Sequence, residues 1–317
     1  MKLFHVLKPG LFTTVQDLGR DGYLRYGIPV SGAMDKFSFI AANSLVANNQ
    51  NDACLEITLI GPDLEVLTKT QIAITGGGVS PKVNDQSVPV WQTLDIQKDD
   101  IVSFERTASG CRAYLSVRGG IDVPLALGSR STYVRGGFGG KNGRQLKIGD
   151  IIEGFDAQPL NVKYSIPDNL VPQFTDEFTA HIILGPQADM FTEKGIDTFL
   201  TSPYKVTTEA DRMGYRLEGP TVEHKEKADI ISDALLPGAV QVPKNGKPII
   251  IMRDAQTTGG YAKIAAVITP DLAVLGQAKP NGVIEFAKIT MQQAREKLQK
   301  YDEGLKALST GIRSHSK

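Results

Sequence analysis

The sequence contains little cysteine, little histidine and no excess of charge. Lysine plus arginine and aspartate plus glutamate number 35 each, so the formal net charge is zero. A balanced charge argues against recruitment of nucleic acid or an acidic membrane by a net electrostatic field. The two cysteines, Cys54 and Cys111, are most simply interpreted as reduced thiols, although a pairing between them stays open. The four histidines are far apart and follow no metal-ligand spacing, so we expect no zinc site.

Long apolar runs and a secretory signal are also absent. No apolar run reaches the length of a bilayer span, and Pro9 comes too early for the apolar part of a signal peptide. We therefore predict a cytoplasmic protein without a membrane partner. The length of 317 residues, 41% of them hydrophobic, suits two ordinary domains better than one.

Glycine and proline are frequent, at 32 and 17 residues, and divide the chain into the short segments of a strand-rich protein. Helical spacing appears at 36–46, at 188–200 and after Thr290, whose helix is expected to reach about Leu308. The stretch 158–173 holds three prolines and is predicted to be a linker. A hairpin is expected at 146–151, and strands at 3–7, 55–60, 64–67, 72–74, 88–94, 101–104, 112–117, 181–184, 204–207, 215–217, 239–242, 248–252, 264–268 and 283–286. The apolar stripe of the last helix is expected to consist of Met291, Ala294, Leu298, Tyr301 and Leu305.

The two halves of the chain share an order of polar and glycine residues. Thr13-Thr14, Asp17, Arg20 and Gly22-Tyr23 are echoed by Thr207-Thr208, Asp211, Arg212 and Gly214-Tyr215. Any single echo is compatible with coincidence among turn residues, but the shared order favours a duplicated β-rich domain. We predict a mainly β protein with a few peripheral helices and two domains, 1–172 with a glycine-rich loop and 173–317 with a C-terminal helix. Two similar barrels side by side would form a cleft, where binding sites commonly lie.

The densest polar segment, MRDAQTTGGYAK at 252–263, follows an apolar run and is closed by a predicted Gly-Gly-Tyr turn. A second polar segment, 207–216, looks like its companion. Each ion pair in them could be purely structural, but carboxylate, amide and guanidinium groups together suit recognition of a small planar amide or carboxylate. The candidate catalytic residues are Asp254, Asp211 and Arg212. The candidate substrate-binding residues here are Arg216, Gln241, Arg253, Gln256, Thr257, Thr258, Gly259, Gly260, Tyr261 and Lys263.

A glycine-rich loop at 135–144 has two interpretations. Its backbone N–H groups and basic side chains could cradle a phosphate, or the loop could be a surface turn. It is not a P-loop, because Arg135 replaces the first glycine and Asn142 replaces the Mg²⁺-binding hydroxyl residue. No complete ATP motif occurs elsewhere in the chain. No Ser or Cys nucleophile stands in a recognisable setting either, and this second absence argues against acyl-enzyme chemistry. The candidate anion- or nucleotide-binding residues are Arg135, Gly136, Gly137, Gly139, Gly140, Lys141 and Arg144.

Several longer motifs carry a family resemblance. They are GLFTTVQDLGRDGYLRYGIPVSGAMD at 10–35, LEITLIGPDL, GGFGGKNGRQLKIGD, ILGPQADMF, DRMGYRL and QTTGGYAKIAAVI. In combination they are specific, and the chain resembles the biotin-dependent carboxyltransferase or allophanate hydrolase subunit 2 family over nearly its whole length. Within that family a stand-alone chain of this length is most similar to the 5-oxoprolinase C subunits, also called KipA, the antagonist of the kinase inhibitor KipI. The resemblance implies a pair of cyclophilin-like β-barrel domains.

The resemblance also implies a reaction, which is ATP-dependent opening of the lactam 5-oxoproline to glutamate. It implies ATP with Mg²⁺ in a complex, on this chain or on a partner, and the partners would be a KipI-like protein and a LamB/YcsF-like protein. Asp254 or Asp211 would take the lactam N–H proton, and Arg212 or Arg216 would hold the carboxylate or developing phosphate charge. Gln256, Thr257 and Thr258 would orient the amide, and Gly259 and Gly260 would permit close approach. Asp17, Arg20 and Ser31 match the family motif and would line the same cleft.

Two other functions stay open at this point. A carboxyltransferase needs biotin on a carrier, and the Ala-Met-Lys-Met attachment motif is missing, since 33–36 reads Ala-Met-Asp-Lys. A chain of the carboxyltransferase type that acts on a urea- or allophanate-like amide would therefore need biotin on another chain. The chain could instead be an antagonist that binds a KipI-like inhibitor without catalysis of its own.

Overall fold

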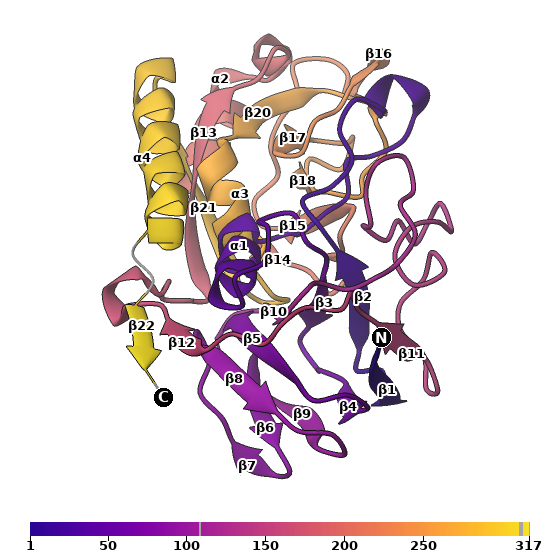
Figure 1. Ribbon diagram of the computed structural model, residues 1–317. Helices are drawn as coiled ribbons and strands as arrows, with labels where there is room; N and C mark the ends of the chain where they lie inside the picture. Colours follow the sequence, from indigo (N-terminus) through magenta and orange to yellow (C-terminus); the bar gives the residue numbers. More distant parts are fainter. Residues whose placement is uncertain (108, 311–312, 317) are drawn as a thin grey trace. The chain divides into compact units, whose positions relative to one another are not determined.

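The computed structural model describes residues 1–107, 109–310 and 313–316 (Figure 1). These residues form a mainly β structure with four α-helices, which confirms the predicted fold class. The chain divides into two compact units. The first unit holds 1–20, 31–174 and the chain from Gly304, and the second holds 21–30 and 175–303. The short segment 21–30 thus leaves the first half of the sequence to join the second unit.

The core of the first unit is built from two antiparallel sheets and one helix. The six-stranded sheet has the order β11-β1-β4-β9-β6-β7 and the five-stranded sheet the order β2-β3-β10-β5-β8. Apolar side chains of both sheets, such as Leu3, Val15 and Ile57, form one buried cluster. The strand bounds are β1 Lys2–Lys8, β2 Phe12–Gln16, β3 Cys54–Thr58, β4 Asp63–Val66, β5 Thr70–Gly76, β6 Val79–Val83, β7 Gln86–Ser87, β8 Thr93–Ile96, β9 Ile101–Arg106, β10 Arg112–Val117 and β11 Ile151–Glu153. Helix α1, Lys36–Leu45, begins at Asp35, whose carboxylate accepts the Ser38 N–H at 3.1 Å.

The second unit contains a closed barrel of seven strands in the order β13-β20-β17-β18-β15-β14-β21. Neighbouring strands are antiparallel except β13 and β21, which run parallel. A separate two-stranded ribbon pairs β16 with β19. The barrel bounds are β13 Glu177–Leu184, β14 Tyr204–Val206, β15 Gly214–Glu218, β17 Ala239–Gln241, β18 Ile249–Ile251, β20 Lys263–Val267 and β21 Val283–Lys288, and the ribbon strands are β16 Asp229–Ala234 and β19 Thr258–Tyr261.

Three helices follow strands of this unit: α2 Glu193–Thr201, α3 Thr269–Leu275 and α4 Met291–Thr310. The aromatic ring of Phe199 on α2 stacks on Phe286 of β21 with ring centroids 4.3 Å apart, and this contact packs helix α2 against the barrel. Thr290 caps α4 as expected, because its hydroxyl accepts the Gln293 N–H at 3.2 Å. No helix in the described residues is long and apolar enough to cross a membrane. Cys54 and Cys111 are buried and form no disulfide with each other.

Five local predictions are wrong. The expected strand at 88–94 is mostly absent, because β7 ends at Ser87 and β8 begins only at Thr93. The expected hairpin at 146–151 is a turn that leads into the single strand β11. The expected linker contains strand β12, Val162–Ser165, which pairs with β22, Arg313–Ser316, and the 3₁₀ turn η2, Asp168–Leu170. The expected helix at 188–200 is interrupted, because Thr192 starts a new helix by accepting the Gly195 N–H at 2.9 Å. The Gly-Gly-Tyr segment is part of strand β19 and makes no turn.

Candidate functional site

The hydrogen-bond ladder of β15 and β18 places Arg212 beside Asp254. Gly214 lies opposite Ile251 in this antiparallel pair. Beyond the strands the ladder continues, because Met252 N–H donates to Met213 C=O at 2.9 Å and Asp254 N–H to Arg212 C=O at 2.8 Å. Two polar segments that are 42 residues apart in the sequence are therefore held together by backbone bonds.

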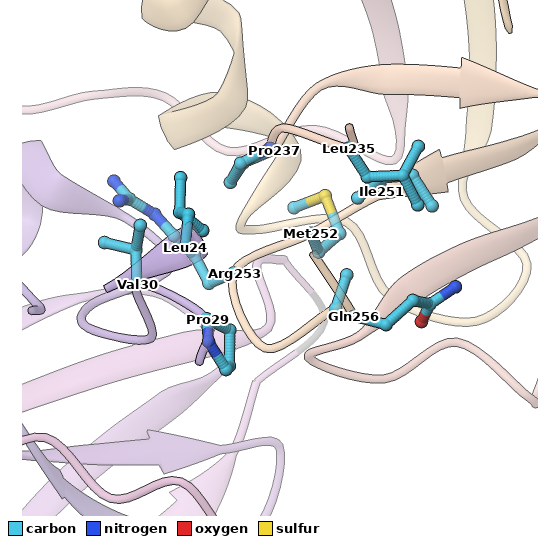
Figure 2. Close-up of a pocket in the computed structure, with 10 residues that line it drawn as sticks. Leu24, Pro29, Val30, Leu235, Pro237, Ile251, Met252, Arg253 and Gln256 are labelled. Atoms are coloured by element: carbon cyan, nitrogen blue, oxygen red, sulfur yellow. The ribbon is translucent and has the colours of Figure 1, made fainter. Parts of the chain in front are cut away.

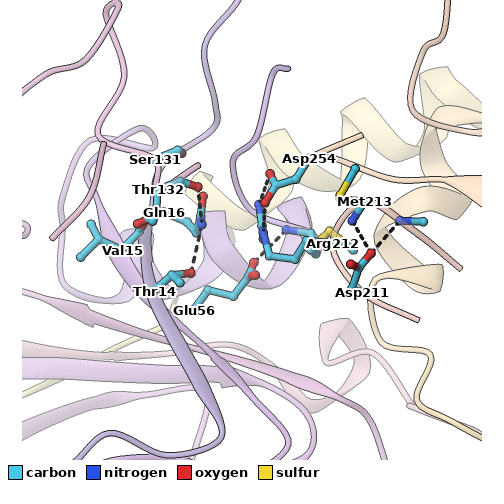
Figure 3. Close-up of polar contacts among 12 residues, drawn as sticks. Thr14, Val15, Gln16, Glu56, Ser131, Thr132, Asp211, Arg212, Met213 and Asp254 are labelled. Carbon is cyan, nitrogen blue, oxygen red and sulfur yellow. Dashed lines mark hydrogen bonds and ion pairs between the residues drawn. The ribbon is translucent and has the colours of Figure 1, made fainter. Parts of the chain in front are cut away.

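Arg212 and Asp254 form a buried bidentate ion pair (Figure 3). Arg212 Nε donates to one carboxylate oxygen at 2.8 Å and Nη2 donates to the other at 3.0 Å. Each residue is only 5% exposed. Removing two charges from water is costly, and a fork of two charge-assisted bonds is the geometry that offsets this cost best. The pair fixes the plane of the guanidinium, so Asp254 acts first as the residue that positions Arg212.

Asp211 has a local structural role. Its side chain is exposed, and Oδ1 accepts the N–H groups of Met213 at 2.7 Å and Gly214 at 3.1 Å (Figure 3). These bonds close the turn that precedes β15. Of the two carboxylates predicted as catalytic, Asp254 lies in the buried pair and Asp211 holds the turn beside it.

Arg253 and Gln256 line a small pocket with residues from the segment 21–30. Figure 2 shows Leu24, Pro29 and Val30 on one side of it, and Leu235, Pro237, Ile251, Met252 and Ala255 complete its lining. Its volume is about 10 Å³, which leaves room for roughly one water molecule. The residues from 21–30 were missed as site residues, although they lie inside the longest motif of the family resemblance. Within the second unit, the structure thus joins that motif to the polar segment 252–263.

Lys263 and Gln241 hold the β16–β19 ribbon. The buried Lys263 ammonium donates to the Asp233 carboxylate and to Ala234 C=O at 3.2 Å. The hydrogen bond from Lys263 lowers the pKa of Asp233. Gln241 Nε2 donates to Tyr261 C=O at 3.1 Å. The backbone of Gly259 lies so close to Gln241 that a Cβ there would be 2.7 Å from Nε2.

The rest of the polar segment is more exposed. Gln256, Thr258 and Tyr261 are exposed, and Thr257 and Gly260 are half-buried. Arg216 is exposed on β15 and pairs with Glu209 at 3.1 Å. It lines a different surface pocket, about 260 Å³ in volume, which also includes Lys247 and Glu218 and contains neither Arg253 nor Gln256. The structure therefore does not bring Arg216 into the pocket that these two residues share.

The three site residues predicted near the N-terminus lie in the first unit. The buried Asp17 carboxylate accepts four bonds, from the N–H groups of Gly19 and Arg130 and from the hydroxyls of two serines, Ser129 and Ser131. Arg20 is 1% exposed and lies over the Phe138 ring, 4.9 Å from its centroid, while its Nη2 donates to Ser131 C=O. These contacts make both residues anchors of the 126–140 region.

Ser31 differs from these two. It is fully buried with φ +54°, and its hydroxyl has no hydrogen-bond partner in the part of the chain that the structure describes. A buried, unpaired hydroxyl on strained backbone is unusual and is typical of functional positions. That Ser31, Asp17 and Arg20 line a cleft with residues of the second unit stays a prediction.

The glycine-rich loop is folded on itself. The N–H groups of Gly140 and Gly143 donate to Arg130 C=O at 3.0 Å and to Gly139 C=O at 2.7 Å. The Lys141 ammonium donates to Ile151 C=O at 2.8 Å, and Arg144 forms a bidentate pair with Asp150 at 2.7 and 2.8 Å. An anion would have to displace these bonds. Anion binding at Arg135, Gly136, Gly137 and the rest of the loop stays a prediction. Elsewhere among the described residues, no three His, Cys, Asp or Glu side chains are arranged to hold a metal ion.

A comparison with known families matches residues 26–288 to the model of the carboxyltransferase domain, subdomains A and B. The chain belongs to this carboxyltransferase domain family. Among its relatives, the C subunit of 5-oxoprolinase from Escherichia coli K12 is 36% identical over 96% of this chain and 97% of that protein. Urea amidolyase of Lachancea kluyveri is 37% identical over 97% of this chain, which spans only 18% of that much longer protein.

Solved structures of this carboxyltransferase family share the fold. The crystal structure of Kluyveromyces lactis urea carboxylase superposes with a TM-score of 0.90 at 35% sequence identity. The match covers 97% of this chain and 29% of that one. The expected family and fold are therefore confirmed.

Proposed function

We propose that the chain is the C-type component of an ATP-dependent 5-oxoprolinase, which activates the lactam together with a KipI-like partner. A LamB/YcsF-like partner would complete the hydrolysis. The named relative in Escherichia coli supports this choice, because the similarity extends over 97% of that protein, whereas the chain spans only a fifth or less of the urea amidolyase. The activity would belong to the complex, and the protein would be active in the cytoplasm.

The buried Arg212–Asp254 pair is the observation that carries the proposal. A guanidinium held in place by a carboxylate needs no reorganisation when negative charge develops nearby, which is how enzymes stabilise such charge most effectively. Arg212 would hold the carboxylate of 5-oxoproline or the charge of the arriving phosphoryl group. Gln256, Thr257 and Thr258, which follow Asp254 closely in the sequence, would bind the planar amide.

The chemistry explains why a lactam needs such a site. Resonance makes the amide carbon a poor electrophile, so its oxygen attacks the γ-phosphorus of ATP and the bond to ADP breaks. The N–H proton passes to a base, for which Asp254 is the candidate, and the product is an activated imidate. Water then adds to the activated carbon, the ring C–N bond opens and phosphate leaves, which gives glutamate.

ATP, with its Mg²⁺, is a substrate of the complex in this proposal. The glycine-rich loop fits it poorly, because Lys141 and Arg144 are bonded to Ile151 and Asp150. We therefore place the nucleotide on the KipI-like partner.

A second function is favoured by the structural similarity to urea carboxylase, with its TM-score of 0.90. In this alternative the chain transfers a carboxyl group to a urea- or allophanate-like amide. Both functions require a planar N–C=O group to be held and its proton removed. The biotin would have to be carried by another chain, because this sequence lacks the attachment motif.

The test is ATP hydrolysis by the purified chain, alone and with its KipI-like partner, with 5-oxoproline or urea. We expect ADP release that depends on 5-oxoproline and appears only in the mixture. Asp254→Asn should abolish it, whereas Glu209→Gln, which removes an exposed carboxylate near β15, should not. A tight complex without stimulated turnover would contradict the proposal and indicate a purely regulatory role.

A further inference from the structure

The second unit has another cavity, between strand β13 and the first turns of α4. It is lined by His181, Ile289, Gln293, Glu296, Lys297 and Lys300, and we call it the α4 cavity. Its volume is about 320 Å³, which lies within the range of pockets that bind small ligands. None of these residues has a part in the proposed lactam chemistry.

His181 lines this cavity, and one of its two ring nitrogens is hydrogen-bonded to Asp271. Its Nδ1 lies 2.8 Å from Asp271 Oδ2, and the same oxygen accepts the His181 backbone N–H at 2.7 Å. A carboxylate accepts hydrogen bonds, so Nδ1 carries the hydrogen and Nε2 is the nitrogen left for a ligand. In the neutral ring Nε2 is an acceptor, and in the protonated ring it is a donor.

The face of α4 that lines the cavity is polar, and Gln293, Glu296 and Lys300 on it are exposed. Residues 293, 296, 297 and 300 follow the spacing of one helix face. Lys297 on this face is half-buried, whereas Met291 is 56% exposed and Leu298 is 37% exposed. The apolar stripe expected from the sequence therefore leaves two of its members at the surface.

The charged groups of the cavity favour an oxyanion. Lys297 and Lys300 have no ion-pair partner among the described residues. Gln293 Oε1 accepts the Thr290 N–H at 2.9 Å, which leaves its amide N–H groups as donors. Glu296 is the one carboxylate in the lining, and Gln292 Nε2 donates to it at 2.8 Å.

We propose that the α4 cavity binds a phosphate group. The two ammonium groups and the Gln293 amide would donate to its charged oxygens. Hydrogen phosphate also carries one O–H, which can donate to the neutral Nε2 of His181, a match that sulfate and carboxylates do not offer. The phosphate could be the free ion or part of a nucleotide.

The test is a calorimetric titration of the full chain with inorganic phosphate at constant ionic strength. Lys297→Gln should weaken binding by roughly tenfold, the usual loss for one charge-assisted bond. His181→Asn should also weaken it, because the asparagine amide can keep the bond to Asp271 but has no atom in the place of Nε2. Arg295→Gln is the matched control, since it removes one positive charge from α4 outside the cavity and should leave binding unchanged.

The outcomes distinguish a nucleotide from free phosphate as the ligand and show whether the proposed site exists. ADP binding that is tighter than phosphate and equally sensitive to Lys297→Gln would identify a nucleotide site, and weaker ADP binding would identify free phosphate. The proposal would be wrong if phosphate showed no saturable binding, or if Arg295→Gln weakened binding as much as Lys297→Gln. It would also be wrong if sulfate bound as tightly as phosphate to the protein with a neutral His181 ring. The readout is binding alone, so it does not depend on 5-oxoprolinase turnover.

Discussion

Asp254→Asn should be among the most destabilising single substitutions in the second unit. It keeps the size of the side chain but removes the charge of the Asp254 carboxylate, so a guanidinium that is 5% exposed loses this charge-assisted pair. Two charge-assisted bonds, at 2.8 and 3.0 Å, are weakened, and such bonds contribute about 1.5 kcal/mol or more each. Breaking one partner of a buried pair costs about 3–5 kcal/mol. We expect a loss of about 3 kcal/mol, which corresponds to a fall in Tm of roughly 6–12 °C for a domain of this size.

The assay is urea denaturation of a double-mutant cycle with Asp254→Asn, Arg212→Met and the double variant. Because the two side chains interact directly, the double variant should be more stable than the sum of the single losses implies, by about 2 kcal/mol. Glu209→Gln, from the exposed pair with Arg216, should change the free energy of unfolding by less than about 1 kcal/mol. Additive losses in the cycle, or equal losses in Asp254→Asn and Glu209→Gln, would refute the reasoning.

Three further substitutions test other parts of the account. Gly259→Ala should destabilise the chain by about 1–3 kcal/mol, because the new Cβ would lie 2.7 Å from both Gln241 Nε2 and Leu235 Cδ1. Gly304→Ala in α4, where a Cβ meets nothing within 4 Å, should instead stabilise by about 0.5–1 kcal/mol, and thermal unfolding of both variants compares the two directions. The hydrogen bond from Arg144 holds the pKa of Asp150 below its ordinary value, so this pair stabilises the fold above about pH 3.9 and the stabilisation is lost as the pH falls through the lower, folded-state pKa. Asp150→Asn should therefore be less stable than the parent at pH 7 and approach it below about pH 4 in a pH series of Tm values, and a constant difference would disprove the assignment.

Much of the fold was predictable because the strands carry their signal locally. The run 112–117 is entirely apolar or small apart from Arg112 and Tyr114, and it is the central strand β10 with every residue buried. Helix α1 was predictable from Asp35 as a cap and from its apolar spacing. The missed helix α3 is only seven residues long and has Pro270 in its first turn, so helical periodicity has little length in which to appear.

The missed pairings depend on residues distant in the sequence. Strand β19 contains two glycines and no apolar alternation, and it is a strand because β16 supplies its hydrogen-bond partners. Likewise, the segment 21–30 looks like a loop of the first half, and only tertiary packing places Leu24 and Val30 beside Arg253. The sequence did single out Arg212 and Asp254 by residue type, but their bidentate contact follows from the register of β15 and β18, which no local pattern contains.

The most direct test of the central proposal is glutamate formation from 5-oxoproline by a mixture of this chain with its KipI-like and LamB/YcsF-like partners. We predict ATP-dependent formation of glutamate in the complete mixture, none when this chain is omitted, and none when Asp254→Asn replaces it in folded form. Glutamate formation that continued without this chain would contradict the proposed function.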